Sequence, residues 1–196
     1  MKDLFTPEFL AALCHDLRGP VGAFGTWVHV LGSGKASAET QARAIAAMSG
    51  DVRVLGGFIE QLALLGAVGA KSAPALSPLD VVPLLASTRS TAAADSDLVL
   101  TAEAHESELR VMADLDSMQQ IFLLLGSRAL TASGGERTVS LRQTGRFAEL
   151  SLESAAKVRS LGSALLGALT QTQHGEWERA VIESRDVVRM RFPLAA

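Results

Sequence analysis

The chain has 196 residues, 48% of them hydrophobic, so it can bury the core of one large or two small domains. Its formal net charge of −3 argues against binding to nucleic acid or to an anionic membrane surface, because both favour a basic face. The single cysteine, Cys14, excludes an internal disulfide, and without a signal-peptide pattern or an apolar run of roughly 20 residues we expect a cytoplasmic protein outside the membrane.

Two long amphipathic helices are predicted in residues 1–70. The first begins at Thr6, a good N-cap followed by Pro7, and its apolar residues recur every three or four positions as far as Leu31. The second begins near Ser37 after a Gly-Ser-Gly break. Its apolar residues have heptad spacing: Ile45, Met48, Val52, Leu55, Ile59 and Leu62.

The short glycine-rich turn between these helices predicts an antiparallel hairpin. One hairpin buries little apolar surface by itself. We therefore expect two copies to form a four-helix bundle in a homodimer. The alternative is that both helices pack against the rest of the same chain.

Residues 71–78 are predicted to be a linker, and residues 79–196 a second domain that mixes strands and helices. Helices are expected at 79–91 (capped by Ser77), 116–132 and 161–172. Strands are expected at 98–104, 108–113, 138–142, 147–152, 177–184 and 187–192, the first two paired around a polar turn and the next two joined by a turn at 144–146. This order predicts an α/β sandwich with helices on one face of a mixed sheet.

One histidine of the first helix is the candidate functional residue. His15 shares its helix face with Gly19, Gly22 and Thr26, and the apolar residues lie opposite, so we expect the imidazole in solvent. Each glycine inside a helix costs about 1 kcal/mol relative to alanine, and room for an approaching partner would explain both. Pro20 is expected to bend the helix just after the histidine.

The chemistry that fits this histidine is phosphoryl acceptance. A neutral imidazole nitrogen attacks phosphorus in line where the space around it is open. Asp16 could orient the ring or accept its other proton, and Arg18 could contact phosphate oxygens or an acidic partner. The same spacing also fits an ordinary solvated histidine. The other three histidines are not spaced as ligands of one metal site: His29, His105 and His174.

Residues 13–20, Leu-Cys-His-Asp-Leu-Arg-Gly-Pro, resemble the H-box of sensor histidine kinases, in which the histidine is followed by Asp or Glu, Leu, Arg, any residue and Pro. The hairpin around them resembles the dimerisation and histidine-phosphotransfer domain of that family. Residues 114–125 are similar to the lead-in to the kinase N-box, and residues 161–166, 174–176 and 188–194 are similar to the last helix and closing strands of the ATPase domain. The resemblance implies a helical hairpin followed by an ATPase-like sandwich.

The residues that bind nucleotide in that family are missing here. The N-box asparagines, four residues apart, fall on Leu124 and Arg128. The Asp-x-Gly-x-Gly loop is replaced by Glu-Ser-Ala-Ala-Lys-Val at 153–158, and the second glycine-rich segment is reduced to Gly162. Without glycines the backbone cannot form the same loop. We therefore expect little or no ATP binding.

An H-box with a degenerate ATPase-like domain resembles the histidine phosphotransferases of the ChpT and sporulation type. The resemblance implies that His15 carries the phosphoryl group, with Asp16 and Arg18 beside it. It implies a partner-docking face that includes three small residues: Gly19, Gly22 and Thr26. It also implies no cofactor in this chain, Mg²⁺ supplied by the receiver domain of a response regulator, and a hybrid histidine kinase upstream.

Two other functions stay open at the level of sequence. A pseudokinase scaffold would bind a response regulator without chemistry, although it would not need the residues beside His15. An active histidine kinase with an atypical ATP site is the other alternative, and the missing asparagines argue against it. Many kinases with phosphatase activity have Thr or Asn where this chain has Gly19, so we do not expect that activity by that route.

Overall fold

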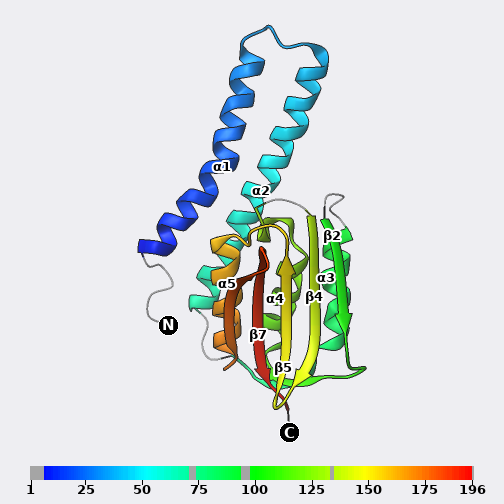
Figure 1. Cartoon of the computed structure of the whole chain (residues 1–196). Helices are drawn as coiled ribbons and strands as arrows, with labels where there is room; N and C mark the ends of the chain where they lie inside the picture. Colours follow the sequence, from blue (N-terminus) through cyan, green and yellow to red (C-terminus); the bar gives the residue numbers. More distant parts are fainter. Residues whose placement is uncertain (1–6, 71–73, 94–97, 133–134, 196) are drawn as a thin grey trace.

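The computed structural model describes residues 7–70, 74–93, 98–132 and 135–195. Helices α1 (Pro7–Gly32) and α2 (Ala38–Ala70) form the predicted hairpin, which extends from an α/β domain (Figure 1). Gly34 has φ +68° in the turn, and Ser37 caps α2 because its Oγ accepts a hydrogen bond from Thr40 N at 3.2 Å. The predicted N-cap Thr6 and the linker residues 71–73 lie outside the described residues.

The α/β domain contains seven strands, three α-helices and two 3₁₀ helices in its described part. They are β1 (Ser77–Asp80), η1 (Val82–Leu84), α3 (Leu85–Ala93), β2 (Leu98–Ala104), β3 (Arg110–Ala113), α4 (Leu115–Gly126), η2 (Arg128–Leu130), β4 (Gly135–Thr144), β5 (Phe147–Ser154), α5 (Ser160–Thr172), β6 (Glu176–Ile182) and β7 (Arg185–Pro193).

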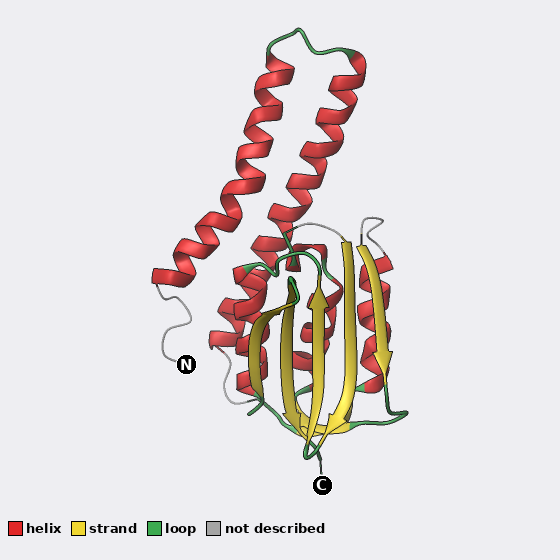
Figure 2. Ribbon diagram, viewed as in Figure 1, coloured by secondary structure: helices red, strands yellow, loops and turns green. Residues whose placement is uncertain are grey.

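Five of these strands form one mixed sheet in the order β2-β4-β5-β7-β6, in which only β2 and β4 are parallel. Helices α3, α4 and α5 cover one face of this sheet, and no helix of the described residues lies on the other face (Figure 2). The predicted sandwich is therefore confirmed. The predicted turn after β4 is also present, with Gly145 at φ +61°.

The predicted pairing of strands 98–104 and 108–113 is wrong. Strand β2 pairs with β4, with Ala102 opposite Val139, and β3 pairs with β1, with Val111 opposite Leu79. The carboxylate of Asp80 explains part of the difference. Its Oδ1 accepts hydrogen bonds from Val82 N at 3.1 Å and from Leu109 N at 3.0 Å, and so joins β1 to the start of β3.

Two predicted helices also have different bounds. The helix expected at 79–91 begins only at Leu85, because the chain first forms β1 and η1, and Pro83 offers no N–H to a helix. The helix expected at 116–132 ends at Gly126. Ser127 has an extended backbone, with ψ 135°, and the guanidinium of Arg137 binds the carbonyls of Leu125 and Ser127 at 3.3 and 2.7 Å.

Within the described ranges, no helix is both long and apolar enough to cross a membrane.

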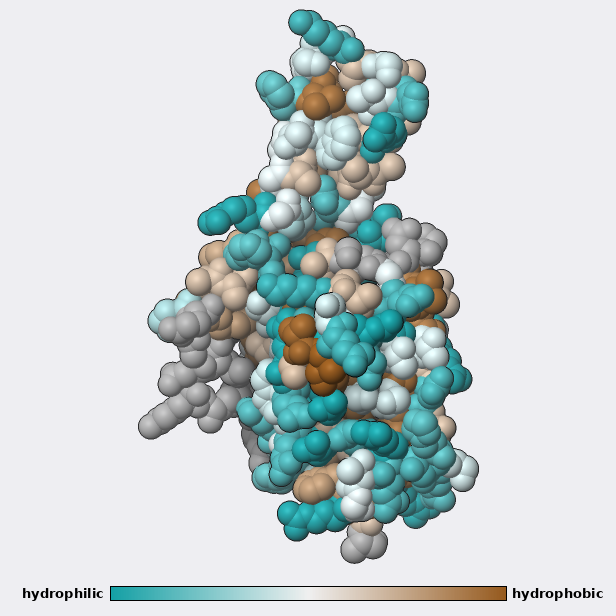
Figure 3. Space-filling model, viewed as in Figure 1, coloured by the Kyte–Doolittle hydropathy of each residue, from teal (hydrophilic) through white to brown (hydrophobic). Residues whose placement is uncertain are grey.

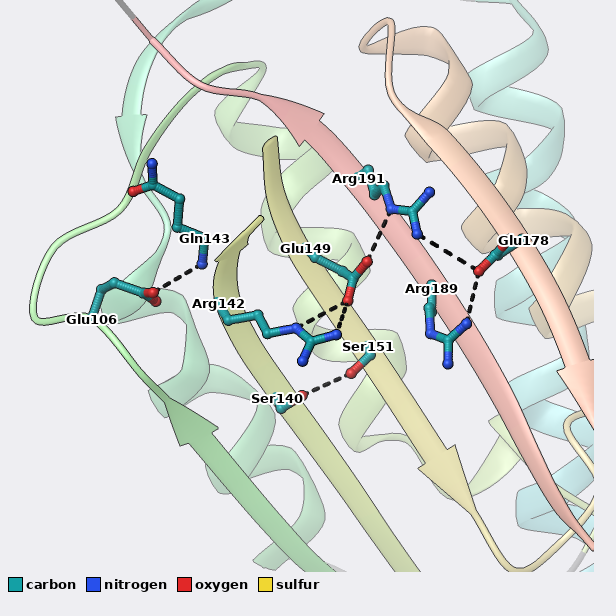
Figure 4. Close-up of polar contacts among 9 residues, drawn as sticks. All are labelled: Glu106, Ser140, Arg142, Gln143, Glu149, Ser151, Glu178, Arg189 and Arg191. Atoms are coloured by element: carbon teal, nitrogen blue, oxygen red, sulfur yellow. Dashed lines mark hydrogen bonds and ion pairs between the residues drawn. The ribbon is translucent and has the colours of Figure 1, made fainter. Parts of the chain in front are cut away.

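The open face of the sheet is largely hydrophilic and carries a network of charged side chains (Figure 3; Figure 4). Glu149 on β5 lies between Arg142 and Arg191, with contacts of 2.6 and 2.9 Å, and Arg191 also approaches Glu178. Burial by itself would raise the pKa of Glu149, but the hydrogen bonds and charges of both arginines outweigh it, so this pKa lies below its usual range. Asp186 has a lowered pKa for a similar reason, because Arg179 and the amide of Val158 outweigh its burial.

We predict that the protein loses stability in acid as these two carboxyls become protonated. Each binds a proton more weakly in the folded chain than in the unfolded chain. Their stabilisation is therefore complete above the unfolded-state pKa, near 4, and is lost as pH falls through the lower folded-state pKa. Glu149→Gln should cost about 1–3 kcal/mol near pH 7 and flatten the acid dependence. Urea unfolding between about pH 7 and pH 3 measures both effects.

The matched control is Glu153→Gln, an exposed carboxylate on the same strand. It should leave stability within about 0.5 kcal/mol of wild type. An acid profile of Glu149→Gln that coincides with the wild-type profile would show that this ion-pair network does not contribute to the pH dependence.

Candidate functional site

The imidazole of His15 lies in solvent on α1, where its side chain is 77% exposed. On the opposite side of this helix Leu13 is only 8% exposed and belongs to the apolar core of the α/β domain. The helical spacing predicts this exposure, and the structure confirms it. The ring is therefore accessible to an approaching partner.

The residues predicted to dock a partner continue the exposed strip that begins at His15. Gly19, Gly22 and Thr26 are all exposed, and a Cβ at either glycine would meet no atom within 4 Å. The hydroxyl of Thr26 donates to the carbonyl of Gly22 at 3.0 Å. Arg18 is exposed as well. These positions leave an open surface beside the imidazole.

Asp16 makes a contact that the sequence does not predict. Its Oδ2 accepts a hydrogen bond from Ser160 N at 2.8 Å, at the first residue of α5, 144 positions away. The N-cap of α5, Arg159, provides no side-chain cap, so a carboxylate from α1 satisfies this helix end. No local pattern signals such a distant partner.

The other carboxylate oxygen of Asp16 faces the imidazole. Oδ1 lies 3.7 Å from Nδ1 of His15, beyond hydrogen-bond distance, so the carboxylate acts on the ring as a nearby charge. A negative charge on this side favours the tautomer with its proton on Nδ1, which leaves the lone pair on Nε2. The predicted orientation of the ring by Asp16 is thus compatible with this geometry, and Nε2 is the nitrogen that could attack.

Arg159 also connects the hairpin to the α/β domain. Its buried guanidinium donates to the carbonyls of Thr131 at 2.8 Å, Ala132 at 3.2 Å and Asp16 at 3.5 Å, and lies 4.9 Å from the ring centroid of Phe58 on α2. The pKa of Arg159 lies below its usual range. Burial lowers it most, the charge of Asp16 opposes this effect, and the charge of Arg128 adds to it. No pattern in the sequence signals this role of Arg159.

A cleft of about 670 Å³ lies where the hairpin meets the α/β domain. We call it the interdomain cleft. Helices α1 and α2 form one side, and Arg128, Ala132 and Arg159 form the other. His15 and Asp16 are part of its lining, and so is Arg128, which stands at an N-box position in the sequence. In the part of the chain that the structure describes, no three metal-ligating side chains of His, Cys, Asp or Glu lie together.

The segments that the resemblance aligns with the nucleotide loops of histidine kinases are packed against one another. Leu124 is only 6% exposed. Lys157 O accepts a hydrogen bond from Ala132 N at 2.8 Å, so the segment after β5 is bonded to the chain after α4. A Cβ on Gly162 would lie 2.6 Å from Cδ1 of Leu130, so this glycine allows α5 to pack closely against η2.

Removing the Asp16 cap should loosen the contact between α1 and α5. Asp16→Ala is expected to cost about 1 kcal/mol, because Ser160 N loses its acceptor. Hydrogen exchange at the Ser160 amide should become faster. Asp16→Asn is the matched control, because its side-chain oxygen can still accept this bond. Equal hydrogen-exchange protection of the Ser160 amide in wild type, Asp16→Ala and Asp16→Asn would contradict the conclusion that Asp16 caps α5.

No family model and no curated protein sequence matches the chain. Solved structures do match it. The histidine kinase AdeS of Acinetobacter baumannii has a TM-score of 0.57 at 16% identity, over 93% of this chain and 98% of that one. A histidine kinase from Burkholderia phymatum has a TM-score of 0.54 at 16% identity, over 96% and 92%.

Full-length ShkA, solved in complex with AMPPNP, has a TM-score of 0.54 at 18% identity; the match covers 97% of this chain but only 46% of ShkA. Identities this low establish similarity of fold alone. The order of two long helices followed by a mixed sheet with helices on one face is common to this chain and these structures. The chain therefore has a histidine-kinase-like fold, with a dimerisation-type helical hairpin followed by an ATPase-like α/β sandwich.

Proposed function

We propose that the protein is a histidine phosphotransferase of a two-component phosphorelay, which carries a phosphoryl group on His15 without taking it from ATP. One observation carries the proposal: an exposed histidine in an intact H-box adjoins a domain whose nucleotide-binding positions hold other residues. Leu124 is buried and Arg128 is a cation, so neither can replace an asparagine as a ligand of Mg²⁺.

The transfer needs one nucleophile from this chain. Nε2 of His15 attacks the phosphorus of an aspartyl phosphate on a receiver domain, forming a P–N bond as the P–O bond breaks, and the receiver's aspartate leaves as a carboxylate. The reverse step passes the group to a second receiver. Receivers supply the aspartate and Mg²⁺, so this chain needs no cofactor of its own. The proposed partners are a hybrid histidine kinase upstream and a response regulator downstream.

The experiment is phosphoryl transfer from labelled phospho-receiver domains, scanned across the host's set, with labelled ATP as a parallel donor. We expect label on the protein from at least one receiver and none from ATP. Label taken directly from ATP would make the protein a kinase and overturn the proposal. A receiver that binds without passing its label would support the scaffold alternative.

The proposal includes a homodimer built on the hairpin. Apolar side chains of α2 remain exposed at heptad spacing: Ile45 at 60%, Val52 at 54% and Ile59 at 68%. On α1, Val21 and Val28 are 57% and 49% exposed, also seven residues apart. A second hairpin would cover these side chains in a four-helix bundle.

We predict that Ile59→Glu converts the dimer to a monomer, because a buried unpaired carboxylate at the centre of such a bundle costs several kcal/mol. Sedimentation equilibrium measures the change in mass. Val181→Glu is the control, since Val181 is 74% exposed on β6, away from the hairpin. A dimer that persists in Ile59→Glu would place the contact between copies elsewhere.

A further inference from the structure

We infer that the ATPase-like domain determines which nitrogen of His15 carries the proton, because the N-terminus of α5 holds the carboxylate of Asp16 beside the imidazole. Ser160 and Arg159 are then positioning residues for the transfer. The inference rests on the proposed function and gives the ATPase-like domain a part in it that needs no nucleotide. The two domains meet at this carboxylate: one oxygen of Asp16 bonds the amide of Ser160 at 2.8 Å, and the other lies 3.7 Å from Nδ1 of His15.

The α/β domain, and not the imidazole, fixes the position of this carboxylate. The side chain of Asp16 is 12% exposed, whereas that of His15 is 77% exposed. An exposed side chain changes rotamer within nanoseconds, but a nearly buried carboxylate bonded to a backbone amide stays in one place. The ring therefore adjusts to the carboxylate, and the carboxylate does not adjust to the ring.

Two further features attract a negative charge to this end of α5. The helix has 13 residues, and the unsatisfied amides of its first turn give this end a partial positive charge. The guanidinium of Arg159 is also close, because it donates to the main-chain carbonyl of Asp16 at 3.5 Å. The charge of Asp16 opposes the effect of burial on the pKa of Arg159, as expected for opposite charges held near each other.

The chain that leads into α5 is itself held in place. Val158 donates its N–H to Oδ2 of Asp186 at 2.8 Å, and its carbonyl accepts a hydrogen bond from Arg179 at 2.8 Å. The next amide, that of Arg159, donates to the carbonyl of Leu130 at 2.8 Å. The first amide of α5 therefore points in a fixed direction, which a group that orients a reacting side chain requires.

A carboxylate fixed beside Nδ1 favours the tautomer with the proton on that nitrogen. Nε2 then keeps the lone pair that attacks phosphorus. The ring gains positive charge as the new P–N bond forms, and the nearby carboxylate stabilises that charge as well. If Asp16 were released from α5, more of the rings would carry their proton on Nε2, which then has no lone pair for the attack.

Ser160→Pro removes the amide donor with little change to the helix. Proline has no N–H, and Ser160 is the first residue of α5, where proline is well tolerated. Arg159 before it has φ −69° and ψ 149°, a conformation that suits the residue before a proline. Leu115→Pro is the matched control, because it makes the same change at the first residue of α4, after Asp114 with ψ 123°.

Nitrogen NMR of the unphosphorylated full-length protein measures the ratio of the two tautomers, with His15→Ala to assign the His15 signals among the four histidines. We expect the ratio of Nδ1–H to Nε2–H to fall about threefold in Ser160→Pro and to keep its wild-type value in Leu115→Pro. Asp16→Asn can still accept the Ser160 amide through its oxygen, but it turns an N–H₂ donor toward the ring. The ratio should therefore fall in this variant too, although the cap of α5 is kept.

Phosphoramidate, a small phosphoryl donor, measures the effect on the transfer without a partner. Nε2 attacks the phosphorus, the P–N bond of the donor breaks and ammonia leaves with the electron pair. Because only rings with a lone pair on Nε2 react, phosphohistidine should form about twofold to threefold more slowly in Ser160→Pro and at the wild-type rate in Leu115→Pro.

An unchanged ratio of tautomers in Ser160→Pro would overturn the inference while leaving the proposed function intact. A wild-type protein that accepts no label from phosphoramidate or from any phospho-receiver would overturn the proposed function, and with it the inference that rests on it.

Discussion

His15→Ala is expected to lower acceptance of a phosphoryl group by at least about 1000-fold, because it removes the only nucleophile that the proposed reaction uses. The fold should be unaffected. The imidazole is 77% exposed and lies 3.7 Å from the carboxylate of Asp16, beyond hydrogen-bond distance, so little packing is lost. Labelling from a phospho-receiver measures the first effect, and thermal unfolding should place the free energy of unfolding within about 0.5 kcal/mol of wild type.

The matched control is His29→Ala, because His29 is also an exposed histidine of α1 and lies in its last turn. It should retain full acceptance. Label that reaches His15→Ala at the wild-type rate would mean that another residue carries the group. Loss of label in both variants would instead indicate damage to the hairpin surface on which a receiver docks.

Arg137→Leu is expected to have the largest effect on stability. Arg137 is 2% exposed, and its guanidinium donates to the carbonyls of Leu125 and Ser127 and to Oγ1 of Thr131. Leucine would leave these buried acceptors without their donor. The expected loss is about 3–5 kcal/mol, and Tm should fall by roughly 10 °C for a chain of this length.

Urea unfolding and a thermal scan measure this loss, with Arg110→Leu as the control. The side chain of Arg110 is 65% exposed and pairs with the exposed Glu108, so its replacement should cost less than about 1 kcal/mol. A change of less than about 1 kcal/mol in Arg137→Leu would mean that water or a rearranged backbone satisfies the three acceptors. Because Arg137 supports Ser127, the variant should also displace Arg128 from the interdomain cleft.

The parts of this fold that the sequence predicts are those with a short-range signal. Heptad spacing predicts the hairpin, glycine at 145 predicts a turn, and the helical spacing around His15 predicts an exposed ring. Pairing of β3 with β1 has no such signal, because it depends on Asp80, which bonds Leu109 from 29 positions away. Alternating apolar residues predict a strand but do not determine which other strand pairs with it.

The candidate site also has residues that a short-range pattern predicts and contacts that depend on distant residues. The resemblance of eight consecutive residues to an H-box predicts His15 and Asp16 as site residues. The second contact of Asp16, with Ser160, requires knowing how α5 packs on α1, and so does the place of Arg159 beside Phe58. Arg128 is only partly predictable from the sequence. The sequence marks it as a replaced N-box residue, and only the structure brings it to the cleft that His15 lines.

The packing around Gly162 would oppose the introduction of nucleotide-binding residues into this domain. Leu130 fills the space beside this glycine, and the carbonyl of Lys157 bonds the amide of Ala132. Asparagine in place of Leu124 would put an amide at a position only 6% exposed. Each such substitution made singly would therefore meet a backbone that other contacts already hold.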